Sequence, residues 1–293
     1  MRILFIGTVE FSRNTLLRCI SHKANIVGII TRQRSPINSD FASLVPIASK
    51  YSIPIECTTD INDKKTIDWI KDKRPDYIFC FGWSTLLRSD LLSIPRLGVV
   101  GFHPSALPKN RGRHPLVWAL ALGLKETAST FYFMDSSADS GDLLSQEIVP
   151  ITYEDNARSL YNKVTEIAMS QIDSILPMLF SGIVPKISQD HHLSNFWRKR
   201  SHEDGRIDFR MSSRSIYNLI RSLSEPYPGA HIRQGQNEII VWNASEIDCM
   251  FNNIEPGKVL TINKDGILVK CGEGAILLTD HEFREPPKLG DYL

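Results

Sequence analysis

The chain has 293 residues, of which 42% are hydrophobic and 23% charged, and its formal net charge at neutral pH is +1. These values are typical of a globular protein with one or two cores, and so small a charge gives no general attraction to nucleic acid. The five cysteines include no Cys-x-x-Cys pair, which argues against a zinc cluster or a disulfide framework. We therefore expect a cytoplasmic protein with no metal, no signal peptide and no membrane partner.

The first half of the sequence alternates between apolar runs and segments with helical spacing. The apolar runs predict strands at residues 2–7, 26–30, 53–55, 77–81, 98–102 and 129–133. The helical spacing predicts helices around residues 15–20, 42–51, 64–73, 114–124 and 160–179. Because most of these runs are too apolar to leave one face in water, we expect an α/β fold: a Rossmann-like, mostly parallel sheet with helices on both faces.

The character of the sequence changes near residue 190. A polar stretch at 189–210 is expected to be a linker, and it separates a first domain at 1–188 from a smaller, β-rich, OB-like domain at 211–293. The second domain is predicted to begin with a helix at 213–222. Short strands are expected to follow at 238–242, 258–262, 266–269 and 275–278, separated by glycine-containing turns.

Two polar side chains follow neighbouring strands of the predicted first domain. His103 comes directly after the strand at 98–102, and Asp139 lies on the loop after the strand at 129–133. Open α/β sheets bind ligands at the ends of their strands, so the two loops are expected to meet there. An imidazole whose tautomer is set by a carboxylate is suited to moving protons, although each residue alone is more often structural.

A longer motif surrounds these two residues. Residues 103–112 read His-Pro-Ser-Ala-Leu-Pro-Lys-Asn-Arg-Gly, and Asp139-Ser-Gly follows with its aspartate 36 residues after His103. This pattern resembles the catalytic core of the folate-dependent formyltransferases, and the resemblance extends over about residues 1–280. It implies an enzyme that transfers the formyl group of 10-formyltetrahydrofolate to an amine, with His103 and Asp139 as catalytic residues and Ser105 as a helper.

The motif departs from the family at one position, because Gly101 stands where the family has an asparagine that holds the formyl oxygen. Asn110, Ser105, a backbone N–H or a water molecule are candidates to replace that contact, and the sequence does not choose among them. A buried donor of this kind contributes about 3 kcal/mol in well-measured oxyanion holes.

The resemblance also implies binding residues around the catalytic pair. For the folate they are Phe81, Trp83, Leu87 and Asp135, and for the acceptor they are Glu10, Arg111 and Gly112. Arg111 and its neighbour Arg113 have the forked geometry that suits phosphate, or they pair with carboxylates inside the protein. Trp83 either stacks on a heterocycle or packs in the core.

The C-terminal segments at 196–208 and 226–230 are similar to the second domain of methionyl-tRNA formyltransferases and sugar N-formyltransferases. No lysine-rich face suited to a tRNA backbone is apparent in that domain, which favours a nucleotide-linked amino-deoxysugar destined for surface polysaccharide, such as a lipopolysaccharide O-antigen. The sugar-enzyme resemblance implies a homodimer. Two alternatives stay open: a methionyl-tRNA formyltransferase, with tRNA as partner, and a folate- or nucleotide-binding regulator that has lost catalysis through Gly101.

Overall fold

The computed structural model describes residues 1–34, 39–235, 237–248 and 253–293, so Cys249 lies outside the described residues. The chain forms two compact units. The first unit comprises Met1–Pro115, Thr127–Val149 and Asn162–Trp197, and the second comprises Leu116–Glu126, Pro150–Tyr161 and Arg198–Leu293. Two short segments of the first 188 residues therefore belong to the second unit.

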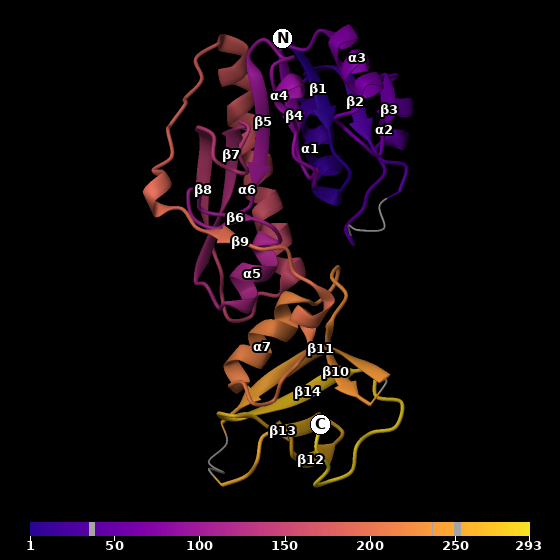
Figure 1. Cartoon of the computed structure of the whole chain (residues 1–293), viewed down its shortest axis with the longest axis vertical. Helices are drawn as coiled ribbons and strands as arrows, with labels where there is room; N and C mark the ends of the chain where they lie inside the picture. The colour runs from indigo at the N-terminus through magenta and orange to yellow at the C-terminus, as the bar shows by residue number, and fades with distance from the viewer. Residues whose placement is uncertain (35–38, 236, 249–252) are drawn as a thin grey trace. The chain divides into compact units, whose positions relative to one another are not determined.

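A seven-stranded sheet with the order β3-β2-β1-β4-β5-β7-β8 organises the first unit (Figure 1). Its strands are β1 Arg2–Ile6, β2 Asn25–Thr31, β3 Ile55–Cys57, β4 Tyr77–Cys80, β5 Gly98–His103, β7 Glu126–Phe133 and β8 Leu143–Pro150. The chain starts at β1, moves outward to β3 and returns to β4 on the other side of β1. The loops after β1 and β4 therefore diverge, which is where such sheets form their ligand crevice.

Helices cover both faces of this sheet. They are α1 Glu10–Ser21, α2 Val45–Lys50, α3 Lys64–Lys73, α4 Ser89–Leu92 and α6 Ala157–Ser181, whereas α5 Pro115–Ala121 belongs, apart from its first residue, to the second unit. Ile78 on one face packs in a cluster with Ile70 of α3 and Leu91 of α4. On the other face the rings of Phe81 and Phe11 of α1 meet edge to face, with their centroids 6.3 Å apart. The predicted α/β class is thus confirmed.

The sheet differs from the prediction at its last strands. The pairs from β3 to β5 are parallel, whereas β7 runs antiparallel to β5 and places Gly101 opposite Tyr132 and His103 opposite Thr130. Strand β8 was not predicted, because its buried positions do not alternate regularly with exposed ones. Strand β3 begins after Pro54 rather than before it, since proline has no N–H for the ladder.

The second unit contains a five-stranded sheet with the order β10-β11-β14-β13-β12, and every pairing in it is antiparallel. Its elements are α7 Ser213–Ser222, β10 Ala230–Gln234, β11 Asn237–Ile247, β12 Val259–Asn263, β13 Gly266–Lys270 and β14 Ala275–His281. Ser212 accepts a hydrogen bond from the Ser215 N–H and so caps α7, whose Ile216 and Ile220 are buried in the core of the unit. The smaller β-rich domain is confirmed, with β10 as a strand that was not predicted.

Four short elements complete the secondary structure. β6 Arg111–Gly112 pairs in parallel with β9 Phe196–Trp197, and two 3-10 turns cover η1 His191–Leu193 and η2 His202–Gly205. Among the described residues, no helix combines the length and the apolar character needed to cross a bilayer.

Candidate active site

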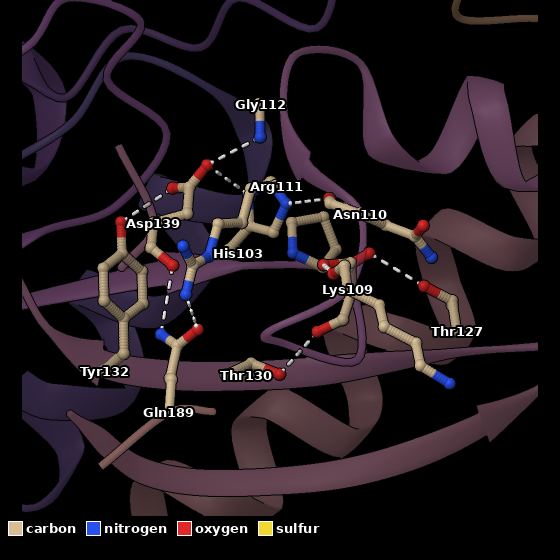
Figure 2. A network of polar contacts seen from close by, with 12 residues as sticks. His103, Lys109, Asn110, Arg111, Gly112, Thr127, Thr130, Tyr132, Asp139 and Gln189 are labelled. Atoms are coloured by element: carbon tan, nitrogen blue, oxygen red, sulfur yellow. Dashed lines mark hydrogen bonds and ion pairs between the residues drawn. The ribbon is translucent and has the colours of Figure 1, made fainter. Parts of the chain in front are cut away.

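His103 is the last residue of β5, and a tightly bonded loop follows it. The hydroxyls of Thr127 and Thr130 on β7 donate hydrogen bonds to the carbonyls of Pro104 and Ser105, at 2.9 and 2.7 Å. The Ser105 hydroxyl donates in turn to the Lys109 carbonyl at 3.0 Å. The loop is thus held against β7, and it returns the chain to His103 (Figure 2).

The returning loop fixes the imidazole of His103. Its Nε2 lies 2.8 Å from the carbonyl oxygen of Asn110, which has a left-handed φ of 63°. Since a carbonyl oxygen only accepts hydrogen bonds, Nε2 carries the hydrogen and donates it. The other ring nitrogen, Nδ1, lies 3.6 Å from Oδ2 of Asp139. That separation is longer than a hydrogen bond, so the lone pair of Nδ1 remains available to accept a proton.

Asp139 is held by donors from two other elements. Its Oδ2 accepts the N–H of Gly112 at 2.9 Å, and its Oδ1 accepts the hydroxyl of Tyr132 at 2.9 Å (Figure 2). Gly112 has a φ of 105°, and a Cβ there would lie 2.3 Å from the carbonyl oxygen of Trp197, so only glycine fits this position. Asp139 itself has a φ of 56°, a conformation that non-glycine residues seldom adopt.

A cavity of about 470 Å³ opens onto this pair. The loop after β1 contributes Val9, and the loop after β4 contributes residues 82–86, as the divergence of these two loops predicts. Polar groups on its wall include those of His103, Tyr132, Asp139 and Arg113. The rest of the lining is partly apolar and includes Trp83, Leu86, Phe102 and Met134. The site therefore places a histidine and an aspartate, side chains able to accept or release protons, beside a space large enough for a small-molecule substrate.

Two residues expected at the site lie behind it. Ser105 is fully buried and its hydroxyl is used by the loop, so it is absent from the cavity lining. Arg111 is also buried and donates to Gln189 Oε1 at 2.6 Å, while His191 Nδ1 lies 3.0 Å from the same Nη2. Gln189 donates in turn to the carbonyls of Asp139 and Gly141. Arg111 thus supports the Asp139 loop from behind.

The residues expected to bind folate fall into two groups. Trp83 lines the cavity, and its indole N–H is buried with no hydrogen-bond partner among the described residues. Phe81 and Leu87 lie in the hydrophobic core, at 1% and 4% exposure. Asp135 is exposed, and its Oδ1 accepts hydrogen bonds from the Ser137 N–H and the Ser140 hydroxyl, on the two sides of Asp139 in the same loop.

The residues expected to bind the acceptor are also divided. Gly112 lines the cavity beside Asp139. Glu10 begins α1, next to the lining residue Val9, but is not part of the lining itself, and its carboxylate lies 3.9 Å from Arg13. Arg113 lines the cavity and donates to the Ser84 carbonyl at 2.6 Å, so it places a guanidinium on the wall.

Sequence reasoning did not select Tyr132 or Gln189. Both lie outside the motif, and their importance depends on which strand lies beside which. A search for polar residues at β7 positions paired with β5 would have found Tyr132, because it faces Gly101 in the register of the sheet.

A second group of side chains, in the second unit, has the composition of a metal site. The ligand atoms of His202, His231 and Glu238 lie within 4.8 Å of one another. His202 and Glu238 also form an ion pair, with 3.2 Å between Nε2 and Oε2, and the rings of His202 and His231 are stacked at 4.3 Å. The group is thus accounted for as a surface ion pair beside a buried histidine.

Structural comparisons find the same fold in known enzymes. WlaRD, a sugar 3N-formyl transferase crystallised in the presence of dTDP and 5-N-formyl-THF, is 18% identical over 96% of this chain and 97% of its own, with a TM-score of 0.72. An N-formyltransferase from Helicobacter canadensis, in complex with folinic acid and dTDP-3-aminofucose, is 15% identical over 95% and 98% of the chains, with a TM-score of 0.73. Methionyl-tRNA formyltransferase from Clostridium thermocellum is 20% identical over 87% and 95%, with a TM-score of 0.62. At these identities the likeness is one of fold.

Family comparisons reach the level of sequence. The model named "Formyl transferase" matches residues 1–175, and the model named "Formyl transferase, C-terminal domain" matches residues 199–289. The first match contains both His103 and Asp139, and the two matches together cover most of the chain. The resemblance carried by the motif is thereby confirmed, and the chain belongs to the formyl transferase family.

Proposed function

We propose that this chain transfers the formyl group of 10-formyltetrahydrofolate to the amine of a nucleotide-linked amino-deoxysugar. The observation that carries the proposal is the pair formed by His103 and Asp139, which face one cavity of about 470 Å³. Family membership supports the reaction class, and the pair supplies the proton chemistry that formyl transfer to an amine requires.

His103 is the base in this proposal. Because Nε2 donates to the Asn110 carbonyl, the neutral ring presents the lone pair of Nδ1 toward the cavity side. As the amine nitrogen bonds to the formyl carbon, its proton passes to Nδ1, and the positive ring is stabilised by the carboxylate of Asp139. The bond between the formyl carbon and N10 then breaks, and the same proton returns to N10, so that protons balance over the cycle.

The cavity wall fits a folate co-substrate, which when bound supplies the electrophilic formyl carbon. Trp83, Phe102 and Met134 offer an apolar surface for a flat heterocycle. The buried indole N–H of Trp83 has no hydrogen-bond partner among the described residues, and a ligand acceptor would satisfy it. Of the other residues expected to bind folate, we propose that Phe81 and Leu87 shape the slot from the core and that Asp135 shapes the loop before Asp139.

The proposed acceptor follows from a positive charge on the wall of the cavity. Arg113 is a lining residue, and a guanidinium forks onto the oxygens of a diphosphate. The sugar enzymes with the same fold were crystallised with dTDP or dTDP-3-aminofucose, which supports a nucleotide sugar as substrate. Arg111 and Ser105 are proposed to act indirectly, by holding the loops on which Asp139 and His103 lie.

The setting of the reaction is part of the proposal. We propose a cytoplasmic homodimer that supplies a formylated sugar for surface polysaccharide. The four described cysteines, Cys19, Cys57, Cys80 and Cys271, are free thiols, which supports a reducing compartment. Light scattering of the purified protein would test the dimer.

The reaction is tested by mass spectrometry with 10-formyltetrahydrofolate and a panel of nucleotide-linked amino sugars. We expect one sugar to gain the mass of one formyl group with the wild type. His103→Ala should abolish the gain, whereas His192→Ala, which removes an exposed histidine outside the cavity lining, should leave it unchanged.

The same assay includes the alternatives as separate arms. If methionyl-tRNA is formylated and no sugar in the panel is, the acceptor is tRNA and not the proposed nucleotide sugar. Binding of folate without any formylated product would indicate a regulator that has lost catalysis. Product formation that survives His103→Ala would contradict the proposed base.

A further inference from the structure

Tyr132 occupies the space above Gly101. The two residues face each other across the antiparallel pair β5–β7. A Cβ built on Gly101 would lie 2.9 Å from Cζ of the Tyr132 ring and 2.8 Å from Cγ of Met134, closer than such atoms approach in proteins. Only glycine at position 101 therefore allows the Tyr132 ring to lie where it does, and the ring takes the place that a side chain at 101 would need.

The hydroxyl of that ring ends on Asp139. Tyr132 is 3% exposed and lines the cavity, and its hydroxyl donates to Oδ1 at 2.9 Å. Burial, and then the nearby Asp139 carboxylate, raise the pKa of Tyr132 well above its ordinary value of 10. The phenol thus stays protonated at neutral pH and acts as a donor.

The bond determines which way the carboxylate faces. Oδ1 is held by Tyr132, whereas Oδ2 is held by Gly112 and lies nearest to His103. Rotation about the last side-chain bond of Asp139 is otherwise soft, because terminal carboxylate torsions have broad minima. Two donors from opposite sides, one on each oxygen, restrict that rotation.

We propose that Tyr132 is a positioning residue of the active site, whose hydroxyl orients the Asp139 carboxylate toward His103 and whose ring requires glycine at position 101. The inference rests on the proposed function for its kinetic effect, and on the geometry alone for its effect on Asp139. Gly101 then has an indirect role in the reaction, because its lack of a side chain leaves space for the Tyr132 ring.

The test is Tyr132→Phe, which removes the hydroxyl and keeps the ring. We expect kcat to fall about 10- to 100-fold, the size typical of losing a buried hydrogen bond to a charged group, with KM for both substrates changed less than about threefold. Tyr77→Phe is the matched control, since Tyr77 is equally buried on β4 and lies outside the cavity lining; its kcat should stay at the wild-type value.

A double-mutant cycle separates positioning from simple packing. If the hydroxyl acts through the carboxylate, Tyr132→Phe should have little further effect on the residual activity of Asp139→Asn. Equal fold losses in the two backgrounds would overturn the proposal while leaving the formyl transfer intact.

A measurement without substrate covers the case in which no acceptor is found. Imidazole nitrogen NMR of the wild type should show the His103 Nδ1 signal shifted by Tyr132→Phe and unchanged by Tyr77→Phe. An active wild type with an unchanged kcat in Tyr132→Phe overturns the positioning role alone. An inactive wild type overturns the proposed function, and an unshifted His103 signal then overturns the positioning role as well.

Discussion

Buried polar side chains occur in both units, and their partners differ. In the first unit, His103 and Asp139 line a cavity, and the 3.6 Å gap between Nδ1 and Oδ2 leaves the lone pair of Nδ1 available to accept a proton. In the second unit, Arg221 donates from Nη1 to the carbonyls of Thr152, Tyr153 and Asp155 at 2.8, 3.1 and 3.0 Å.

Lys270 of the second unit behaves like Arg221. It is 5% exposed, and its Nζ donates to the carbonyls of Cys271 and Gly274. Burial of a polar group is therefore not by itself a sign of function. Hydrogen-bonding capacity that is left unused beside a cavity distinguishes the first unit, and the comparison predicts that changes there reduce activity while changes in the second unit reduce stability.

Asp139→Asn should have the largest effect on activity. The amide keeps the shape of the side chain but removes the charge that stabilises a protonated His103, so we expect kcat to fall about a thousand-fold. Asp142→Asn, in the same loop but outside the cavity lining, is the control and should keep its activity. Comparable losses in the two variants would refute the distinction between them.

Arg221→Met should have the largest effect on stability. It removes the buried guanidinium that donates to three carbonyls and to Asn218 Oδ1, and we expect the free energy of unfolding to fall by about 2–4 kcal/mol. Arg210→Met removes an exposed side chain paired with Asp208 and should cost less than about 0.5 kcal/mol. Urea denaturation measures both, and a stable but inactive Arg221→Met would contradict the structural assignment.

Gly101→Ala tests the packing of Tyr132 directly. The added methyl group would meet the Tyr132 ring and Met134, so we expect a loss of about 1–3 kcal/mol in the free energy of unfolding. In a Tyr132→Ala background the ring is gone and only the contact with Met134 remains, so the same change should cost clearly less than in the wild type. An equal cost in both backgrounds would show that the ring is not the obstacle.

The smallest effect expected is on the pH dependence of stability. Burial, and then His202, lower the pKa of His231 below its ordinary value of 6.5, although Glu238 and Glu203 oppose this and Arg206 adds to it. His231 therefore takes up its proton at higher pH in the unfolded chain than in the folded one. Its contribution to the free energy of unfolding is fully present above about pH 6.5, the ordinary value, and is lost as the pH falls below it toward the pKa of the folded state. His231→Gln should flatten the change in urea midpoint between about pH 7.5 and about pH 5.5; an unchanged slope would contradict it.

The sequence was sufficient to predict the parts of the fold that depend on local pattern. The apolar runs from Ile3 to Phe102 identified the parallel strands, and the position of His103 at the end of one of them located the crevice. The extent of β11 was missed, since Glu238–Trp242 was predicted and Asn237–Ile247 was found. Its later residues, Asn243–Ile247, are mostly exposed and polar, so they carry little of the apolar pattern that marks a strand.

Residues whose role depends on which residue they face across a sheet could not be predicted from the sequence. Tyr132 appears in the sequence as one aromatic residue of an apolar strand, and only the antiparallel pairing with β5 places it over Gly101. Motif membership, in turn, did not show which residues reach the cavity. Ser105 and Arg111 belong to the motif and lie behind the site, because Ser105 bonds within the loop after His103 and Arg111 bonds to Gln189, which holds the loop of Asp139.

The central claim is that the cavity shared by His103 and Asp139 transfers a formyl group to an amine. The most direct measurement is single-turnover transfer from 10-formyltetrahydrofolate to the accepted nucleotide-linked amino sugar, comparing the wild type with Asp139→Asn at saturating concentrations of both substrates. We expect a rate about a thousand-fold lower in the variant, with unchanged substrate binding. A rate equal to that of the wild type would contradict it, because the reaction would then take place without the charge on Asp139.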